Sequence, residues 1–361
     1  MESEKEIRAL RKKIDILDEK VLKLLNQRAE TVLRVGKVKK RSRKSYYNPA
    51  RETEIFQRLE SHHSGPFPRW AISSVFREIV SACRGLEADL TVAYFGPPAT
   101  FSHMACIQHF GKSIRMVPEN SIHDVFEAVE EGKKDYGVVP IENSTEGPVG
   151  ETLDLLVKSE LRICSEITTR ISHDLLSRRG RAEDIEKVCS HPQALAQCRE
   201  WLKKHFSRVQ LEEAGSTARA AQLAMEDPKT AAIASSLAAQ VYKLKIVASQ
   251  IEDNPYNFTR FLVLGRKDAE RTGRDKTSML FSIPHAPGTL FQCLQIFCEK
   301  GINLTRIESR PTKERPWEYI FFIDFEGHTT DSTVCAALDK LKGHTLFLKL
   351  LGSYPQNTQE G

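Results

Sequence analysis

The first forty residues carry an apolar repeat that strongly constrains what this chain can fold into. Its members alternate three and four residues apart: Ile7, Leu10, Ile14, Leu17, Val21, Leu24, Val35 and Val38. This spacing predicts a heptad seam on one helix reaching about Arg41, roughly 50–60 Å long at ~1.5 Å per residue. A helix of that length cannot bury its stripe in a unit of about 90 residues. We therefore expect another chain to pack on it.

Polar side chains interrupt this seam at Arg28 and Thr31. A charge inside an apolar seam is costly unless it is paired or meets a ligand. Lys39 follows Arg28 by about three turns, so the two side chains point nearly the same way. Arg11 points about 100° away from them, for example toward a partner chain.

Two further helices complete a basic N-terminal unit. Asn48-Pro49 is typical of an N-cap with proline at the first helical position, and it opens a helix that carries Arg51-Glu52. After a break at residues 64–68 comes a third helix, whose apolar face is continued by Glu87. Residues 1–88 hold 20 Lys+Arg against 12 Asp+Glu. Because an exposed basic stripe with interleaved aromatic residues is missing, a buried pocket for a compact polyanion fits better than nucleic-acid binding.

The spacing of these charged residues closely resembles the all-helical chorismate mutase domain, from residue 4 to about residue 88 without a gap. Three positions depart from the usual form: Asn48 stands in place of aspartate, Cys83 of serine and Glu87 of glutamine. The resemblance implies an intertwined dimer in which Arg11 reaches into the partner's active site. The chorismate-binding set that it implies is Arg11, Arg28, Lys39, Asn48, Arg51, Glu52, Cys83 and Glu87.

The reaction of that family is a pericyclic rearrangement, which needs no nucleophile, metal or cofactor but gains from orientation and charge stabilisation. The implied roles are carboxylate binding by Arg11, Arg28 and Arg51, contact with the ether oxygen by Lys39 and Glu87, and contact with a hydroxyl by Glu52. Glu87 donates a hydrogen bond only when protonated, and an apolar face favours that form by raising its pKa. We therefore expect mutase activity to fall as pH rises.

Beyond residue 90, short β-rich runs alternate with amphipathic stretches, which predicts α/β layers with mainly parallel sheets. Small hydroxyl or amide residues stand at the strand-to-helix junctions: Thr100, Ser102, Asn143, Ser144, Ser190, Gln193, Ser216, Thr217, Ser235 and Ser236. Each alone is typical of an N-cap. Together, at the carboxyl ends of strands, they predict a site for carboxylates.

Four strings in this region resemble prephenate dehydratase, and they stand in the order found in that family. They are IENS at 141–144, SHPQAL at 190–195, STA at 216–218 and NFTRFLVL at 257–264. The likeness spans about residues 90–265. It implies two α/β lobes with a cleft, similar to periplasmic solute-binding proteins, the chain returning to the first lobe near its end.

The resemblance also implies the roles of the dehydratase residues. Thr259 is the implied proton donor and Arg260 a carboxylate-binding or positioning group. The implied prephenate-binding set is Thr100, Ser102, Asn143, Ser144, Gln193, Ser216, Thr217, Arg260 and Phe261. His191 is an alternative acid, although its place beside Pro192 in a turn favours a structural role.

A charged linker at residues 267–276 leads to a β-α-β-β-α-β pattern over 277–354, which predicts a ferredoxin-like fold. Two strings here, PGTL at 287–290 and ESRP at 308–311, resemble the regulatory ACT domain of prephenate dehydratases. The resemblance implies a phenylalanine site at a dimer interface, made by Pro287, Gly288, Thr289, Leu290, Asn303, Leu304, Glu308, Ser309 and Arg310. A pairing domain without a ligand is the alternative. Residues 355–361 are expected to be a disordered tail.

The whole chain therefore resembles a bifunctional chorismate mutase–prephenate dehydratase, an isomerase and carbon–oxygen lyase, with domains at 1–88, 89–266 and 276–354. Chorismate and prephenate are the expected substrates, phenylalanine the effector, and a homodimer or a dimer of dimers the assembly. We expect no cofactor, metal, nucleic acid or membrane partner.

Cysteine spacing and hydropathy bear on where the protein acts. The eight cysteines lack C-x-x-C spacing, which favours reduced thiols in the cytoplasm. No apolar run has the ~18–20 residues that span a bilayer. Three alternatives stay open: an arogenate dehydratase for the second activity, a solute-binding module without catalysis, and a basic helical nucleic-acid binder.

Overall fold

The computed structural model describes residues 2–42, 46–312 and 318–356. The chain divides into a helical unit, made of residues up to 48, 55–90 and 110–115, and an α/β unit made of the rest. The three N-terminal helices are α1 (Glu2–Ser42), α2 (Pro49–Ser61) and α3 (Arg69–Glu87). The predicted helix starts after Asn48 and after the break at 64–68 are confirmed. Among the described residues, no helix combines the length and apolar character needed to cross a membrane.

Helix α1 is one continuous helix whose apolar seam stays uncovered by its own chain. Leu24 and Val38, two members of the seam, are 64% and 63% exposed. Near its C-terminal end α1 packs on α3, and there Gly36 is buried. A Cβ at Gly36 would lie 3.3 Å from Cγ of Glu87, so this glycine lets α3 approach α1 closely beside Glu87.

The first lobe of the α/β unit is a six-stranded sheet of order β2-β1-β3-β11-β5, with β4 paired to β3. Its strands are β1 (Thr91–Phe95), β2 (Arg115–Glu119), β3 (Tyr136–Asn143), β4 (Gly147–Pro148), β5 (Arg162–Arg170) and β11 (Phe258–Gly265). Its helices are α4 (Phe101–Phe110), α5 (Ile122–Glu130) and α6 (Gly150–Lys158). Val125, Val129 and Leu153 of these helices are fully buried against Leu262 of the sheet.

The second lobe is a five-stranded sheet of order β10-β6-β9-β7-β8. Its strands are β6 (Asp174–Ser177), β7 (Lys187–Ser190), β8 (Gln210–Glu213), β9 (Thr230–Ala234) and β10 (Lys245–Ala248). Its helices are α7 (Pro192–Gln197), α8 (Arg199–His205), α9 (Thr217–Glu226), α10 (Ser236–Val241) and the 3-10 turn η1 (Ala182–Asp184). The buried alanines Ala220, Ala221 and Ala224 let α9 pack closely on β9.

Two crossings join the lobes, at residues 171–173 between β5 and β6 and at 249–257 between β10 and β11. After the second crossing β11 inserts between β3 and β5 and runs antiparallel to both. The predicted return of the chain to the first lobe is thus confirmed. The expectation of mainly parallel sheets is wrong, because β6 and β11, the strands that follow the two crossings, run antiparallel to their neighbours. The pairs β1–β3, β7–β8 and β7–β9 are parallel.

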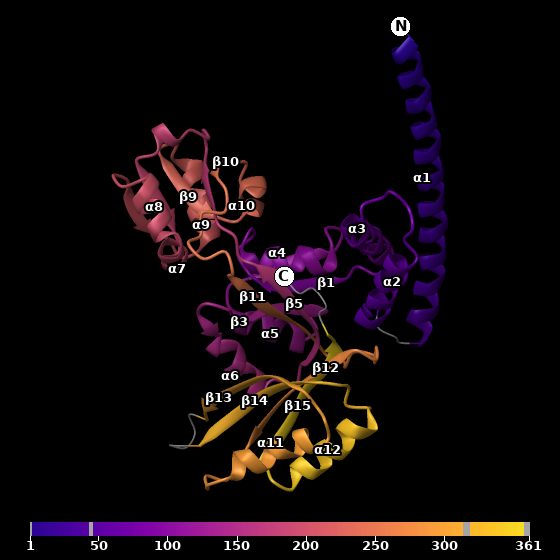
Figure 1. The fold of residues 1–361 in the computed structure, drawn as a ribbon, viewed down its shortest axis with the longest axis vertical. Helices are drawn as coiled ribbons and strands as arrows, with labels where there is room; N and C mark the ends of the chain where they lie inside the picture. The colour runs from indigo at the N-terminus through magenta and orange to yellow at the C-terminus, as the bar shows by residue number, and fades with distance from the viewer. Residues whose placement is uncertain (1, 43–45, 313–317, 357–361) are drawn as a thin grey trace. The chain divides into compact units, whose positions relative to one another are not determined.

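The C-terminal domain has the predicted β-α-β-β-α-β order, with α11 and α12 on one face of its sheet (Figure 1). Its elements are β12 (Asp275–Ser282), α11 (Thr289–Glu299), β13 (Leu304–Pro311), β14 (Tyr319–Glu326), α12 (Ser332–Lys342) and β15 (Phe347–Pro355). The sheet order is β13-β14-β12-β15. The linker is shorter than expected, because Lys276 already lies in β12 and is 9% exposed. The tail begins later than expected, because Pro355 is the buried last residue of β15. Residues 357–361 lie outside the described residues.

The two faces of this sheet bury different cores. On β14, Ile323 and Phe325 pack under α11 and α12. Phe322, which points to the other face, joins one hydrophobic cluster with Leu153 and Leu262 of the first lobe. Gly352 of β15 lies so close to the backbone of Ile163 in β5 that a side chain has no room there. The C-terminal domain and the first lobe therefore share a core.

Candidate functional site

A cleft of about 650 Å³ opens between the two lobes, a volume within the ~300–1,000 Å³ usual for small-molecule sites. Eight of the predicted dehydratase residues line it, as does His191: Thr100, Ser102, Asn143, Gln193, Ser216, Thr217, Thr259 and Phe261. Ser144 and Arg260 do not. The structure therefore brings together, in one cavity, residues that lie up to about 160 positions apart in the sequence.

Two helix N-termini reach this cleft through capped junctions. Ser216 caps α9, its Oγ accepting a hydrogen bond of 3.0 Å from the Arg219 N–H. Thr100 Oγ1 accepts a weak hydrogen bond of 3.4 Å from the His103 N–H at the start of α4. Each helix has ten residues, long enough for its positive dipole end and free N–H groups to favour a carboxylate.

The other junction serines serve the fold. Ser190 is buried, and its hydroxyl donates to the carbonyl of Ile233 at 2.6 Å. Ser235 caps α10 and donates to the carbonyl of Ala99 at 3.1 Å. Ser235 is thus a helix cap, the ordinary role of such a residue. The Ser190 hydroxyl instead links β7 to β9, and the cap of α7 is His191, whose Nδ1 accepts a hydrogen bond of 3.3 Å from the Gln193 N–H.

Thr259 lies on β11 at the base of the cleft, directly opposite Asn143 on β3. Asn143 Nδ2 donates to Thr259 Oγ1 at 2.8 Å. Thr259 is 9% exposed, so its hydroxyl is largely shielded from bulk water. Strand pairing therefore joins the two sequence strings IENS and NFTRF into one local site.

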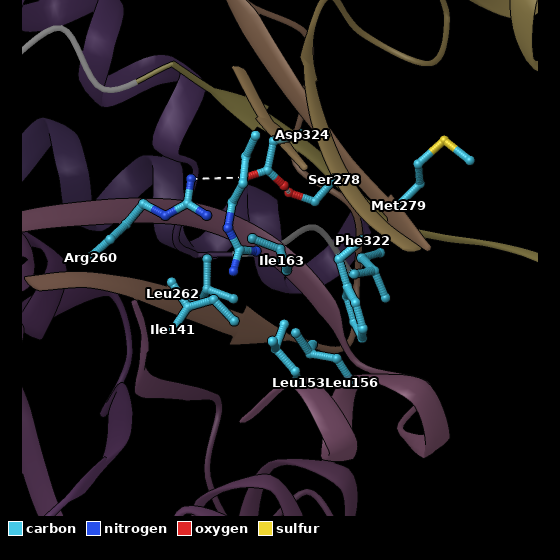
Figure 2. A pocket seen from close by; sticks show the side chains of 12 residues that line it. Ile141, Leu153, Leu156, Ile163, Arg260, Leu262, Ser278, Met279, Phe322 and Asp324 are labelled. Carbon is cyan, nitrogen blue, oxygen red and sulfur yellow. Dashed lines mark hydrogen bonds and ion pairs between the residues drawn. The ribbon is translucent and has the colours of Figure 1, made fainter. Parts of the chain in front are cut away.

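Arg260 points to the face of β11 opposite Thr259, because successive side chains of a strand alternate. Its Nη1 lies 2.8 Å from Asp324 Oδ2 and 3.6 Å from Glu166 Oε2. Figure 2 shows Arg260 and Asp324 beside Leu262 and Phe322, where the first lobe meets the C-terminal domain. Arg260 therefore does not face the cleft, which does not fit the predicted contact with a substrate carboxylate. The alternative prediction, a positioning role, remains.

Further charges extend this contact between the domains. Lys276 Nζ lies 2.6 Å from Glu166 Oε1, and Arg306 Nε of β13 lies 3.1 Å from Glu142 Oε2 of β3. Burial by itself lowers the pKa of Arg260, but the carboxylates of Asp324 and Glu166 outweigh it and hold that pKa above its usual value. Arg260 therefore stays charged and tied to the C-terminal domain.

The sequence did not single out several polar residues at the base of the cleft. Asn257 Nδ2 donates to Gln197 Oε1 at 3.1 Å, and His173 Nε2 lies 2.9 Å from the same oxygen. His173 is 2% exposed, and burial lowers its pKa, so the imidazole is neutral. Their position in the chain could have indicated them: His173 and Asn257 lie in the two segments that cross between the lobes, and both segments pass the cleft.

In the helical unit, Lys39 and Glu87 meet as the sequence predicts. Lys39 Nζ lies 2.9 Å from Glu87 Oε2 and 3.2 Å from the carbonyl oxygen of Tyr46. The Glu87 side chain is 10% exposed. Arg28 Nη1 is buried and has no hydrogen-bond partner among the described residues. Cys83 is also buried.

Arg11 does not lie beside this pair, because 28 residues of α1 separate it from Lys39. Arg11 is exposed, and it precedes Arg28 by ~25 Å along α1 at ~1.5 Å per residue. A single chain therefore cannot bring Arg11 and Arg28 to one small ligand. Asn48 is half-buried and Glu52 lies in the first turn of α2, where Arg51 Nη1 contacts Glu54 Oε2 at 2.6 Å.

The predicted effector residues divide between two faces of the C-terminal sheet. Gly288 takes a positive φ of 84° before α11, and Thr289 lines a small cavity with Tyr319 and Phe321. Ser309 pairs with Phe321 across the strands. Arg310, by contrast, faces the first lobe, with Nη2 3.2 Å from Asp154 Oδ1.

The other members of the set lie near these two strings. Pro287 and Leu290 flank the start of α11, and Leu290 packs against the core under the helices. Leu304 packs against the same core, whereas Asn303 is exposed. Glu308 lies between Arg306 and Arg310 on their face of β13 by strand alternation.

Three family models match the chain in sequence order. Chorismate mutase type II matches residues 10–88, prephenate dehydratase matches 92–269 and the ACT domain matches 277–343. These matches agree with the helical unit, the two lobes and the C-terminal sheet.

Relatives cover nearly the whole chain. A bifunctional chorismate mutase/prephenate dehydratase of Aquifex aeolicus is 47% identical over 97% of this chain and 98% of its own. One of Neisseria gonorrhoeae is 43% identical over 96% of each. A prephenate dehydratase of Arthrobacter aurescens, solved in complex with L-Phe, superposes with a TM-score of 0.68 at 38% identity, over 74% of this chain and 90% of its own. The chain belongs to the family of bifunctional chorismate mutase/prephenate dehydratases with an ACT regulatory domain.

Proposed function

We propose that Thr259 is the proton donor of the dehydratase step, in which prephenate becomes phenylpyruvate. In that step the ring carboxylate leaves as CO₂, its bonding electrons enter the ring, and the ring hydroxyl departs as water once it receives a proton. The observation that carries the proposal is the Asn143 to Thr259 hydrogen bond of 2.8 Å. Because Thr259 Oγ1 accepts there, its own proton is available to a hydroxyl in the cleft.

Helix N-termini and hydroxyls are the proposed carboxylate ligands. No Lys or Arg is among the described residues that line the cleft. The start of α9 with Ser216 and Thr217, and the start of α4 with Thr100, supply N–H and hydroxyl donors. Gln193 adds a side-chain amide, and Phe261 an apolar wall.

The Thr259→Ala and Thr259→Ser pair tests the donor. We expect the alanine variant to lose at least ~100-fold in dehydratase kcat, the scale of general acid catalysis, and the serine variant to keep most of it. Mutase turnover of the same preparation reports that the protein is folded. Full dehydratase turnover by Thr259→Ala would remove Thr259 from this role.

For the mutase step, we propose that Arg28, Lys39 and Glu87 of one chain bind chorismate together with Arg11 of the partner. The buried Arg28 Nη1 and the Lys39–Glu87 contact support the first part. The ~25 Å between Arg11 and Arg28 supports the second. The other proposed contacts are Asn48, Arg51, Glu52 and Cys83. Glu87→Gln, which donates at every pH, should flatten the pH profile of mutase activity.

Co-expression of two inactive variants tests the shared site. Arg11→Ala and Arg28→Ala chains each lack mutase activity in this scheme. A mixed dimer regains one intact site, so random mixing should restore about a quarter of the wild-type activity. Absence of any recovery in isolated mixed dimers would show that Arg11 acts within its own chain.

Phenylalanine regulates this family through the ACT domain, and we propose that it binds at Gly288, Thr289 and Ser309 across a dimer interface. The exposed Phe291 and Ile307, 68% and 48% exposed, support an interface on this domain.

The eight free cysteines, six of them buried, support a reduced cytoplasmic setting.

Arogenate is a second candidate for the dehydratase substrate. It carries an amine where prephenate has a keto group, and Glu146 and Glu151 line the cleft. A carboxylate close to that amine would favour the binding of arogenate over that of prephenate. Comparison of kcat/KM for the two compounds decides between them.

A further inference from the structure

Four side chains form a closed hydrogen-bonded ring at the base of the cleft. Asn143 Nδ2 donates to Asn257 Oδ1 at 2.8 Å, and Asn257 Nδ2 to Gln197 Oε1 at 3.1 Å. Gln197 Nε2 lies 3.5 Å from Thr145 Oγ1, the weakest contact, and Thr145 Oγ1 donates to Asn143 Oδ1 at 2.6 Å. Asn143 and Thr145 belong to the first lobe, Gln197 to the second, and Asn257 to a crossing between them. This set is called the amide ring below.

The backbone fixes the direction of every bond in the amide ring. Asn143 Oδ1 accepts from the N–H groups of Thr145 and Glu146, at 3.0 and 3.1 Å, and an N–H can only donate. The nitrogen of Asn143 therefore faces Asn257 and Thr259. It follows that Asn257 turns its oxygen to Asn143 and its nitrogen to Gln197.

The same logic fixes the histidine behind the ring. Gln197 Oε1 already accepts from Asn257, so His173 must donate to it through Nε2. His173 is buried and neutral, and its Nδ1 has no hydrogen-bond partner among the described residues. The Phe101 ring meets the imidazole edge-on, with ring centroids 5.4 Å apart. The imidazole thus holds Gln197 in one orientation.

We propose that Asn257, Gln197 and Thr145 are positioning residues for the dehydratase step: through the amide ring they hold the Asn143 amide so that it donates to Thr259 and turns the Thr259 proton toward the substrate. The proposal rests on the proposed role of Thr259 as donor. The orientation of the Thr259 proton then depends on both lobes, because the amide ring closes only when Gln197 of the second lobe contacts Asn257 and Thr145.

Thr145 offers the cleanest test because it is exposed and does not line the cleft. Thr145→Val keeps the shape and removes the hydroxyl, whereas Thr145→Ser keeps the hydroxyl. We expect the valine variant to lower dehydratase kcat about threefold to tenfold with KM unchanged within about twofold, since one of three donors to Asn143 Oδ1 is lost. The serine variant should match the wild type. Equal kcat for both variants would overturn the role of Thr145.

Asn257→Ala breaks the ring on both sides and should lower kcat at least tenfold. In a Thr259→Ala background the same substitution should have no further effect, because the ring acts through Thr259. Gln108→Leu is the matched control: its amide bonds Thr168 and Thr169 of β5, beside β11, but does not line the cleft. We expect it to leave kcat unchanged.

The outcomes separate the two proposals. If Thr259→Ala keeps its turnover, the donor role itself fails. If Thr259→Ala is inactive but Asn257→Ala keeps the wild-type kcat, only the amide ring fails. A further loss when Asn257→Ala is added to Thr259→Ala would mean that Asn257 acts on the substrate or the fold directly, which also contradicts the positioning role.

Discussion

At the scale of single residues, His173 shows how burial sets a protonation state beside the cleft. Its imidazole is 2% exposed and its pKa is lowered, first of all by desolvation. The hydrogen bond to Gln197 and nearby Glu252 and Asp174 oppose this shift without reversing it. A neutral imidazole can donate at Nε2 while Nδ1 stays unprotonated, which the amide ring requires.

This state makes stability depend on pH. An unfolded histidine takes up a proton near pH ~6.5, whereas folded His173 does so only at lower pH. Below about pH 6.5 the unfolded chain therefore binds more protons, and the free energy of unfolding falls as pH drops toward the folded-state pKa.

His173→Gln, which can still donate to Gln197, should weaken this dependence. Urea unfolding of the second lobe, followed by the fluorescence of Trp201, measures it between pH 7.5 and 5.5, a window spanning the unfolded-state pKa of ~6.5. Some dependence should persist, because burial also lowers the pKa of His103. An identical pH dependence in wild type and variant would show that His173 is not the titrating group.

At the scale of elements, α1 presents an apolar seam that its own chain leaves exposed. Val21, midway along it, is 54% exposed. We expect Val21→Lys to weaken dimerisation at least tenfold, as a charge desolvated in a seam does, and to abolish mutase activity with it. Sedimentation across a concentration series measures the association.

Glu19→Lys is the matched control, since Glu19 lies about 200° around the helix from Val21. It introduces the same lysine on the opposite face and should leave the dimer intact. A Val21→Lys protein that stays dimeric with full mutase activity would show that the seam is not the interface.

The elements themselves were largely predictable. Local signals sufficed for the helix starts at Pro49 and Arg69 and for the β-α-β-β-α-β succession of elements in the ACT domain. The direction of the strands was not predictable, because β11 pairs antiparallel with β3 and β5, whose residues lie 88 or more positions away along the chain. Alternation along β11 also separates Thr259 from Arg260, which a linear motif places in one site.

At the scale of the whole α/β unit, the ACT domain and the first lobe share a hydrophobic core, to which Leu280 and Phe322 contribute. Removing residues 277–361 would expose that core, so a truncated enzyme is a poor test of feedback. Arg260 offers a finer one, because it follows Thr259 in β11 and pairs with Asp324 of the ACT domain.

Asp324→Asn should uncouple the effector from the cleft. The variant keeps the shape of the side chain but weakens the 2.8 Å ion pair to Arg260. We expect phenylalanine to bind within about threefold of its wild-type affinity by calorimetry while inhibition of the dehydratase weakens about tenfold, a coupling loss of ~1.4 kcal/mol.

Glu299→Gln is the control for this prediction. It breaks an exposed ion pair of 2.7 Å to Lys340 within the ACT helices and should leave inhibition unchanged. Wild-type inhibition of Asp324→Asn would show that this ion pair does not carry the signal.

What could not be predicted at this scale depends on distant contacts. The Asn143–Asn257 bond joins residues 114 apart, and the Asn257–Gln197 bond joins residues 60 apart. No local pattern marks such pairs; they arise only when the two lobes and the crossing meet. Asn257 begins the string NFTRFLVL, but only Asn143 and Thr259 were predicted as site residues, and these two are hydrogen-bonded.

The most direct test of the whole scheme is to supply the purified protein with chorismate and follow chorismate and phenylpyruvate, with and without phenylalanine. We expect chorismate to disappear, phenylpyruvate to form and phenylalanine to suppress its formation. Accumulation of prephenate would contradict the dehydratase assignment of the cleft and point to arogenate as its substrate. Persistence of chorismate would contradict the site around Arg28, Lys39 and Glu87.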